Sequence, residues 1–158
     1  MIDVLRSLDT TDRAILKILQ EDAKITNSQL AKEVGLSPAP TLERVRKLES
    51  LGVIQSYHAV LNPSYLGLGV GVFLLITLSS HKKHQIQSFV KKMDDIEQVV
   101  ECHHITGSGD FMIKILTSDI KSYHEFILTY LIEIEEIGNM QSLIILKTYK
   151  QSRSFDLS

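Results

Sequence analysis

Several features are scarce or absent in this chain, and each absence excludes a class of protein. The 158 residues contain no tryptophan and a single cysteine, Cys102. One cysteine excludes an internal disulfide and a zinc site built from paired cysteines, and it is consistent with a reducing compartment. With 44% hydrophobic and 23% charged residues, the chain has the composition of an ordinary globular protein and not of a disordered one.

Long apolar runs are also missing. The longest weakly polar stretch, Gly67–Leu78, is twelve residues long and too short to cross a bilayer. The first residues, with Asp3 and Arg6 among them, lack the apolar core of a signal peptide. We therefore expect a cytoplasmic protein without a membrane partner.

Neither sign of charge is in large excess. The formal net charge is −2, from 17 basic and 19 acidic residues. Residues 1–62 hold eight basic and eight acidic side chains, and the remainder holds nine and eleven. Because a nucleic-acid partner requires clustered Lys and Arg, only the local placement of cations can support DNA binding here.

Two short helices are predicted near the start of the chain. Asp9 precedes an apolar pattern and can cap a helix over residues 10–21. Thr26 and Gln29 have the spacing of a capping box for a second helix, which Gly35 closes in the left-handed conformation.

A third helix follows after a tight turn. Ser37 with Pro38 behind it is typical of a helix start, and the helix extends to about Leu51 and stops at Gly52. A helix followed by two short helices around a glycine-containing turn is the helix-turn-helix pattern. A small three-helix bundle that does not touch nucleic acid is the alternative.

The outward face of this third helix carries cations. At 100° per residue, Leu42, Val45 and Leu48 share the inward face. The free amides of its first turn suit a phosphate group. The candidate DNA-binding residues are Ser37, Pro38, Pro40, Thr41, Arg44, Arg46 and Lys47. A solvated face, in which the cations pair with Glu43 and Glu49, is the alternative interpretation.

The next segment joins two domains. Residues Val53–Val60 have an extended pattern that Asn62-Pro63 breaks, so they form either a wing or a linker. The predicted domains are residues 1–62 and 63–158.

The second half alternates between strand and helix patterns. Strands are predicted over Val70–Leu78, Val99–Ile105, Phe111–Leu116 and Leu143–Tyr149. The first helix shows its apolar residues at Ile86, Phe89, Val90 and Met93. Asp119 caps the second, whose predicted inward residues are Ile120, Tyr123, Ile127, Tyr130, Leu131 and Ile134. This βαββαβ order predicts the α+β ferredoxin-like fold, with both helices on one face of an antiparallel sheet.

The opposite face of the sheet is predicted to be covered as well. Val72–Ile76 and Leu143–Leu146 are apolar at consecutive positions, whereas a half-exposed sheet alternates apolar with polar residues. The economical explanation is a two-fold dimer in which two such sheets pack together.

No constellation of catalytic or metal-binding residues is found. His103 and His104 are adjacent on a strand and point to opposite faces, so they cannot chelate one ion together. His81 and His84 can share a helix face, but solvated histidines are the better interpretation. Cys102, in an apolar strand, is interpreted as a small core residue.

The turn between the two βαβ halves can bind a small zwitterion. Its glycine amides suit a carboxylate and its acidic side chain suits an ammonium group. An ordinary hairpin turn is the alternative. The candidate effector-binding residues are Thr106, Gly107, Ser108, Gly109, Asp110 and Phe111.

Taken as a whole, the chain resembles the Lrp/AsnC (feast/famine) family of transcription regulators. Leu8–Leu16 resembles the opening helix of that family, and Leu36–Glu49 resembles its recognition helix, most similar to the leucine-responsive branch. Gly52–Tyr57 and Leu61–Pro63 resemble its exit and hinge segments. Gly107–Phe111 resembles the effector loop of its RAM domain.

The resemblance implies a winged helix-turn-helix domain followed by a dimerising, effector-binding RAM domain. It further implies cytoplasmic, nucleoid-associated dimers that assemble into octamers, bind double-stranded DNA and respond to leucine or another amino acid held between RAM domains. It places Ser37, Pro38, Pro40, Thr41, Arg44 and Lys47 on the DNA-facing turn. The absence of convergent titratable groups argues against an enzyme, and we expect no cofactor and no metal.

Two other functions stay open. The ferredoxin-like fold also hosts small metabolic enzymes and metal-binding proteins without a DNA function. A ligand sensor whose helix-turn-helix binds another protein is a third possibility.

Overall fold

The computed structural model describes residues 8–152 and 154–157, so Asp3 and Arg6 lie outside the described part. The chain forms two compact units. The helical unit comprises residues 1–60 and 150–158, and the sheet unit comprises residues 61–149. The structure therefore differs from the predicted division at the end of the chain, where residues 150–158 lie with the first unit. Within the described ranges, no helix is long and apolar enough to cross a membrane.

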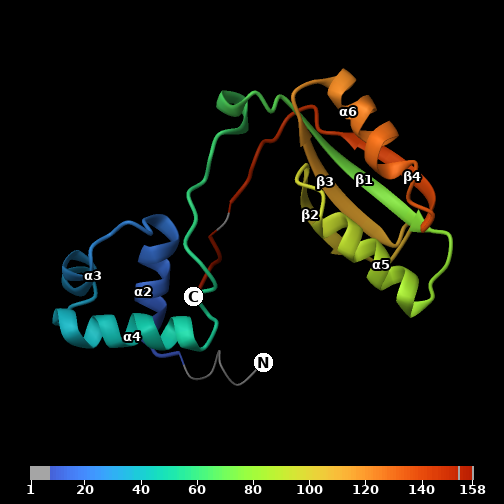
Figure 1. Cartoon of the computed structure of the whole chain (residues 1–158). Coiled ribbons are helices and arrows are strands. Elements are labelled where there is room, and N and C mark those ends of the chain that lie inside the picture. The colour runs from blue at the N-terminus through green and yellow to red at the C-terminus, as the bar shows by residue number, and fades with distance from the viewer. Residues whose placement is uncertain (1–7, 153, 158) are drawn as a thin grey trace. The chain divides into compact units, whose positions relative to one another are not determined.

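In the described part of the helical unit the chain forms three helices, close to the predicted bounds (Figure 1). They are α2 (Thr10–Glu21), α3 (Asn27–Glu33) and α4 (Pro38–Ser50). Both predicted caps are present, because Asp9 accepts a hydrogen bond from the Asp12 N–H and Thr26 accepts one from the Gln29 N–H. Local side-chain hydrogen bonds thus fix where α2 and α3 begin.

The turns and the core complete the helix-turn-helix. Gly35 and Gly52 both have φ of +69°, which a residue with a Cβ rarely adopts, and they end α3 and α4. The buried core of the unit consists of Ile15, Leu16, Leu30 and Leu48. Short helices are marginal alone, so this shared core stabilises all three.

The segment after α4 is a linker in the single chain. Residues 55–62 form neither helix nor strand, and the short 3₁₀ helix η1 (Pro63–Leu66) follows them. The Tyr57 hydroxyl donates a hydrogen bond to Glu49 Oε1 at 2.9 Å. Partial burial and this carboxylate raise the pKa of Tyr57 to about 12. The start of the linker is thereby attached to α4.

The sheet unit has the predicted split βαβ topology. Its strands are β1 (Val70–Leu78), β2 (Val99–His104), β3 (Phe111–Thr117) and β4 (Ile137–Ile144). They form one antiparallel sheet in the order β2-β3-β1-β4. Helices α5 (Lys83–Asp94) and α6 (Ile120–Phe126) supply the connections between strands. Phe89 and Met93 of α5 share one buried cluster with Tyr123 and Phe126 of α6, so both helices cover the same face.

The last strand was predicted at the wrong place. The predicted strand Leu143–Tyr149 begins six residues too late, since β4 pairs with β1 from Ile137 to Ile144. The polar residues Gly138, Asn139, Gln141 and Ser142 concealed it. An edge strand with much of its surface exposed has no need of an apolar run. Leu146 and Tyr149, predicted to be strand residues, are 96% and 88% exposed.

The second helix also differs from its prediction in the residues it buries. Asp119 caps α6 as expected, but a π-helical turn, η2 (Ile127–Leu131), follows Phe126. A π-turn has a wider repeat than an α-helix and shifts the buried face. Tyr130, within the π-turn, is consequently exposed. Ile120 is exposed at the first position of α6, before that turn, and Phe126, absent from the predicted set, is buried.

The two faces of the sheet differ in burial. Alternate residues of β1, from Val72 to Leu78, are buried against the helices. On the other face, Phe73 and Leu75 of β1 and Met112 and Leu116 of β3 are half-buried in the single chain. The same face also carries Lys114, which pairs with Glu101 at 2.7 Å. The second face therefore contains the apolar side chains that the sequence predicted, together with this ion pair, and this chain does not cover it.

An ion pair connects α5 to the residue before β4. The Glu136 carboxylate is 9% exposed and accepts a hydrogen bond from Lys92 Nζ at 2.6 Å. Hydrogen bonds from Lys92 and then Ser88 lower the pKa of Glu136 to about 2. The Glu136 carbonyl also accepts a hydrogen bond from the Ser79 N–H at 2.8 Å, so this residue holds three segments together.

The Glu136 pair predicts a pH-dependent stability. The folded pKa of about 2 lies below the reference value of 4.5, so ionised Glu136 stabilises the fold above pH 4.5 and this contribution fades as the pH falls toward 2. We expect Glu136→Gln to lower the free energy of unfolding by about 1–3 kcal/mol at pH 7, and by clearly less at pH 3. Urea unfolding at both pH values measures this. An equal loss at pH 7 and pH 3 would contradict it.

Candidate DNA-binding and effector sites

The start of α4 is largely exposed. Ser37, Pro38, Arg46 and Lys47 are exposed, and Pro40 is half-buried. Ser37 makes no side-chain capping bond, so the helix starts on proline geometry. Asn27 Nδ2 of α3 donates a hydrogen bond to the Pro38 carbonyl at 2.8 Å and ties the first turn of α4 to α3.

Arg44 does not point outward, and this part of the prediction is wrong. One guanidinium nitrogen, Nη1, lies 2.7 Å from Asp9 Oδ2 and 2.7 Å from Asp12 Oδ1. Asp12 is 1% exposed and lies within the core of the helical unit. The alternative partners, Glu43 and Glu49, form no ion pair with Arg44 either.

These three side chains form a closed network, which we call the Arg44 clamp (Arg44, Asp9 and Asp12). Asp9 Oδ1 accepts from the Asp12 N–H, and Asp12 Oδ2 accepts from the Asp9 N–H at 3.3 Å. All four carboxylate oxygens are therefore used. The Asp12 N–H and then the Arg44 guanidinium lower the pKa of Asp9, and the two carboxylates raise the pKa of Arg44. The clamp fixes α4 on the first turn of α2.

Thr41 is also wrongly placed by the prediction. Its side chain is fully buried, and its hydroxyl donates to the Ser37 carbonyl at 3.0 Å. Leu42, expected inside, is 39% exposed. The inward face thus contains Thr41 and Leu48 with the half-buried Val45, at helical spacings of four and three. Arg46 and Lys47 are the predicted cations that stay exposed.

The clamp predicts a structural role for Arg44. Removing the guanidinium leaves the buried Asp12 carboxylate without its cation, so we expect Arg44→Ala to lower the melting temperature of the helical unit by about 5 °C or more. Arg46→Ala, which removes an exposed cation two residues further along the same helix, is the matched control and should leave the melting temperature unchanged. Calorimetry measures the melting temperatures of the parent and of the two variants. Equal melting temperatures in the parent and Arg44→Ala would contradict the clamp.

The predicted effector loop is a tight turn against β1. The Ile105 N–H donates to the Asp110 carbonyl, and the Asp110 N–H donates to the Ile76 carbonyl, both at 2.8 Å. Thr106, Gly107 and Ser108 are exposed at its tip. Gly107 has φ of +134°, which demands glycine. The tip therefore presents short side chains and main-chain groups to solvent.

Gly109 allows the loop to lie close against β1. A Cβ at Gly109 would lie 2.8 Å from two side-chain carbons of Leu75 and 3.2 Å from the Ile76 carbonyl oxygen. No side chain fits there without displacing β1. Packing against β1 thus explains why this position is a glycine. Gly109 is buried, so its amide does not lie at the exposed tip.

Asp110 is held by the fold from both sides. Its Oδ2 accepts from the Leu78 N–H at 2.8 Å, and its Oδ1 lies 2.9 Å from His81 Nε2. The Leu78 N–H and then His81 lower the pKa of Asp110. The sequence predicts His81 to be a solvated residue, with a metal ligand as the alternative, and does not predict this contact, which joins residues 29 apart.

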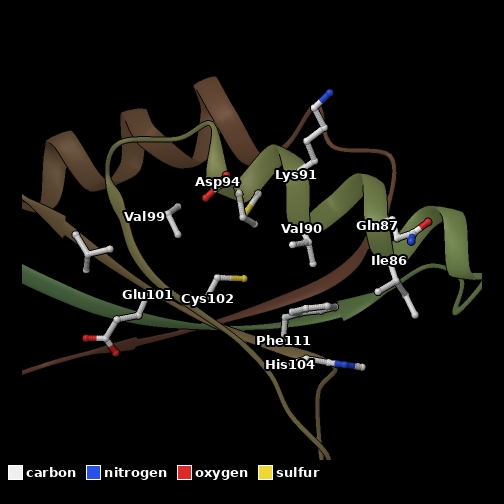
Figure 2. A pocket seen from close by; sticks show the side chains of 12 residues that line it. Ile86, Gln87, Val90, Lys91, Asp94, Val99, Glu101, Cys102, His104 and Phe111 are labelled. Atoms are coloured by element: carbon white, nitrogen blue, oxygen red, sulfur yellow. The ribbon is translucent and has the colours of Figure 1, made fainter. Parts of the chain in front are cut away.

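Phe111 points away from the tip. It is 2% exposed and packs against His104 and Phe89, each with ring centroids 4.7 Å apart. Figure 2 shows it beside His104, next to a groove of about 820 Å³ between α5 and β2. Of the six predicted effector residues, the structure brings Thr106, Gly107 and Ser108 to the surface.

The groove also contains the single cysteine. Cys102 is exposed, so its interpretation as a core residue is wrong. It lies on the edge strand β2, opposite Val90 of α5 (Figure 2). Across the described part of the chain, no three His, Cys, Asp or Glu side chains are arranged to hold a metal ion.

Family models match both units. Residues 8–55 match the model of a winged helix-turn-helix DNA-binding domain, and residues 71–155 match that of the Lrp/AsnC ligand binding domain. The architecture is that of a DNA-binding regulator with a ligand-binding domain.

Curated relatives and solved structures agree with the models. The chain is 39% identical to the transcriptional regulator AzlB of Bacillus subtilis, over 93% of this chain and 94% of the relative. It is 37% identical to the leucine-responsive regulatory protein of Escherichia coli, over 93% and 90%. A crystal structure of a transcriptional regulator from Neisseria meningitidis in complex with L-Met superposes with a TM-score of 0.90 at 31% identity, over 95% and 97%. The chain belongs to the Lrp/AsnC family, and it is a DNA-binding transcriptional regulator of that type.

Proposed function

We propose that the chain is a sequence-specific regulator of amino-acid metabolism genes, which binds double-stranded DNA through α4 and responds to a small amino acid bound by the sheet unit. The observation that supports this most is the coexistence of an exposed helix-turn-helix surface and a ligand-binding unit in one chain. As the relatives are regulators, we also propose that the chain is no enzyme and acts in the cytoplasm, on the nucleoid.

The proposed DNA surface is smaller than the predicted one. It consists of the first turn of α4, with the exposed Ser37 and Pro38 and the half-buried Pro40, and of the exposed cations Arg46 and Lys47. In helix-turn-helix proteins the start of the second helix contacts base edges in the major groove. Arg44 and Thr41 contribute by holding α4 in position and not by touching DNA.

Removing the two exposed cations should weaken DNA binding in a salt-dependent way. Each phosphate contact contributes about one unit to the slope of log affinity against log salt, so Arg46→Ala with Lys47→Ala should reduce that slope by up to about two and the affinity by at least about tenfold at low salt. Fluorescence anisotropy at several salt concentrations measures both. Lys121→Ala, on the exposed side of α6, is the control. An unchanged slope would remove these cations from the interface.

The proposed effector is a small amino acid with an apolar side chain. The similar regulators are a leucine-responsive protein and a protein crystallised with L-Met. In this chain the tip residues Thr106, Gly107 and Ser108 would receive the carboxylate, and Asp110, ionised at neutral pH by its lowered pKa, would receive the ammonium group. We propose that the site is completed by a second subunit, since the loop tip alone is open to solvent.

A conservative substitution separates the charge of Asp110 from its structural bond. Asp110→Asn keeps an oxygen for the Leu78 N–H but loses the negative charge, so it should weaken leucine or methionine binding by about tenfold or more and leave DNA affinity without ligand unchanged. Isothermal calorimetry with leucine and with methionine measures this. Asp95→Asn, at the exposed end of α5, is the control. Equal affinities in the parent and Asp110→Asn would exclude Asp110 from the site.

We further propose that the protein is a homodimer that assembles to an octamer. The uncovered sheet face supports the dimer, because Phe73, Leu75, Met112 and Leu116 leave apolar surface for a second copy of the same sheet. Two copies of α4 would then match the two halves of a palindromic site.

A further inference from the structure

The end of the chain contacts α2. The Phe155 N–H donates a hydrogen bond to Gln20 Oε1 at 2.6 Å, and Gln20 Nε2 donates one to the Phe155 carbonyl at 3.3 Å. The side-chain amide of Gln20 thus binds both the N–H and the carbonyl of Phe155, as a residue of a neighbouring antiparallel strand would do. It is a specific contact with main-chain atoms of the segment.

A second contact lies two residues further on. Arg13 Nη1 donates a hydrogen bond to the Leu157 carbonyl at 3.0 Å, and Leu157 packs against the buried cluster of the helical unit. The segment therefore has two polar anchors and one apolar anchor. All three lie in the helical unit, to which residues 150–158 belong.

The spacing of the anchors gives the direction of the segment. Arg13 and Gln20 are two helical turns apart and so share one face of α2. Phe155 lies at the end of the helix and Leu157 near its start, so the segment runs antiparallel to α2. Two extended residues span about 7 Å and seven helical residues about 10 Å, and the long arginine side chain makes up the difference.

We propose that this face of α2, marked by Arg13 and Gln20, is a docking site for the chain's own C-terminal segment (described residues 150–152 and 154–157), and that the docked segment is a second connection between the helical unit and the sheet unit. The first connection is the linker, residues 55–62. The two connections restrain the helix-turn-helix more than one flexible linker does.

Strand β4, which precedes the second connection, pairs with the end of β1 that contacts the effector loop. Gly109 packs against Leu75, and the Asp110 N–H binds the Ile76 carbonyl of β1. Leu75 and Ile76 pair on their other side with Gln141 and Met140 of β4. Strand β4 ends at Ile144, opposite Val72, and the C-terminal segment follows after Tyr149, so a ligand that displaces the loop can change the docking through β1 and then along β4. This consequence rests on the proposed function.

Hydrogen exchange tests the docking in the full chain. We expect amides of residues 150–158 to exchange about fivefold or more faster in Gln20→Ala than in the parent, because the variant loses both bonds to Phe155. Glu21→Ala, the next residue on the exposed surface of α2, is the matched control and should exchange like the parent. A segment that already exchanges like an unstructured peptide in the parent would overturn the docking site, and so would equal exchange in parent and Gln20→Ala.

DNA binding tests the connection. A variant that lacks residues 150–158 should bind DNA within about threefold of the parent, but leucine or methionine should change its DNA affinity by less than half of the parent's change. A truncated variant that responds like the parent would overturn the connection. A parent that binds neither DNA nor amino acid would instead contradict the proposed function, and the exchange rates would still decide the docking site independently.

Discussion

One guanidinium group determines how the helix-turn-helix is assembled. Arg44 of α4 binds two carboxylates in the first turn of α2, and those carboxylates also cap α2 by binding each other's N–H groups. Helix start, helix packing and the neutralisation of a buried aspartate therefore depend on one set of contacts. Because Asp12 is buried, the clamp is costly to break from either side.

The clamp also limits how this protein can bind DNA. With a net charge of −2 and Arg44 committed to α2, α4 offers two exposed predicted cations, Arg46 and Lys47. Affinity must then come from few phosphate contacts, from main-chain amides at the start of α4 and from the joint binding of several copies. The proposed assembly of subunits would multiply these contacts, and it is therefore part of the proposed function. The uncovered apolar face of the sheet is where such assembly can begin.

In the sheet unit, residues of the predicted effector loop likewise hold the fold together. Asp110 holds the end of β1 through the Leu78 N–H, while Gly109 admits Leu75 and Phe111 enters the core beside His104. Half of the loop is thus built into the fold, and three residues at its tip face solvent. A loop of this kind can transmit a displacement to β1, since it cannot move without moving Leu75.

The sequence was sufficient where the determining contacts are local. The capping boxes at Asp9 and Thr26, the glycine stops at Gly35 and Gly52, and the bounds of β1 follow from neighbours within a few residues. The sequence was insufficient where a partner far away in the chain determines the position of a side chain. Arg44 turns toward residues 32 and 35 positions earlier, Asp110 binds a histidine 29 positions earlier, and Phe155 contacts Gln20 across 135 positions. A helical wheel or an apolar pattern contains no information about such partners, and the polar edge strand β4 has no pattern to detect. The residues of the DNA surface and of the effector site stay predictions, reduced in number by the burial of Thr41 and Phe111.

The most direct measurement is an anisotropy titration of the purified protein with a labelled DNA fragment from its own upstream region and with a scrambled fragment of equal length, each with and without leucine or methionine. We expect tighter binding to the native fragment and a change in that affinity with one of the two amino acids. Equal binding to both fragments at every salt concentration, unaffected by either amino acid, would contradict it.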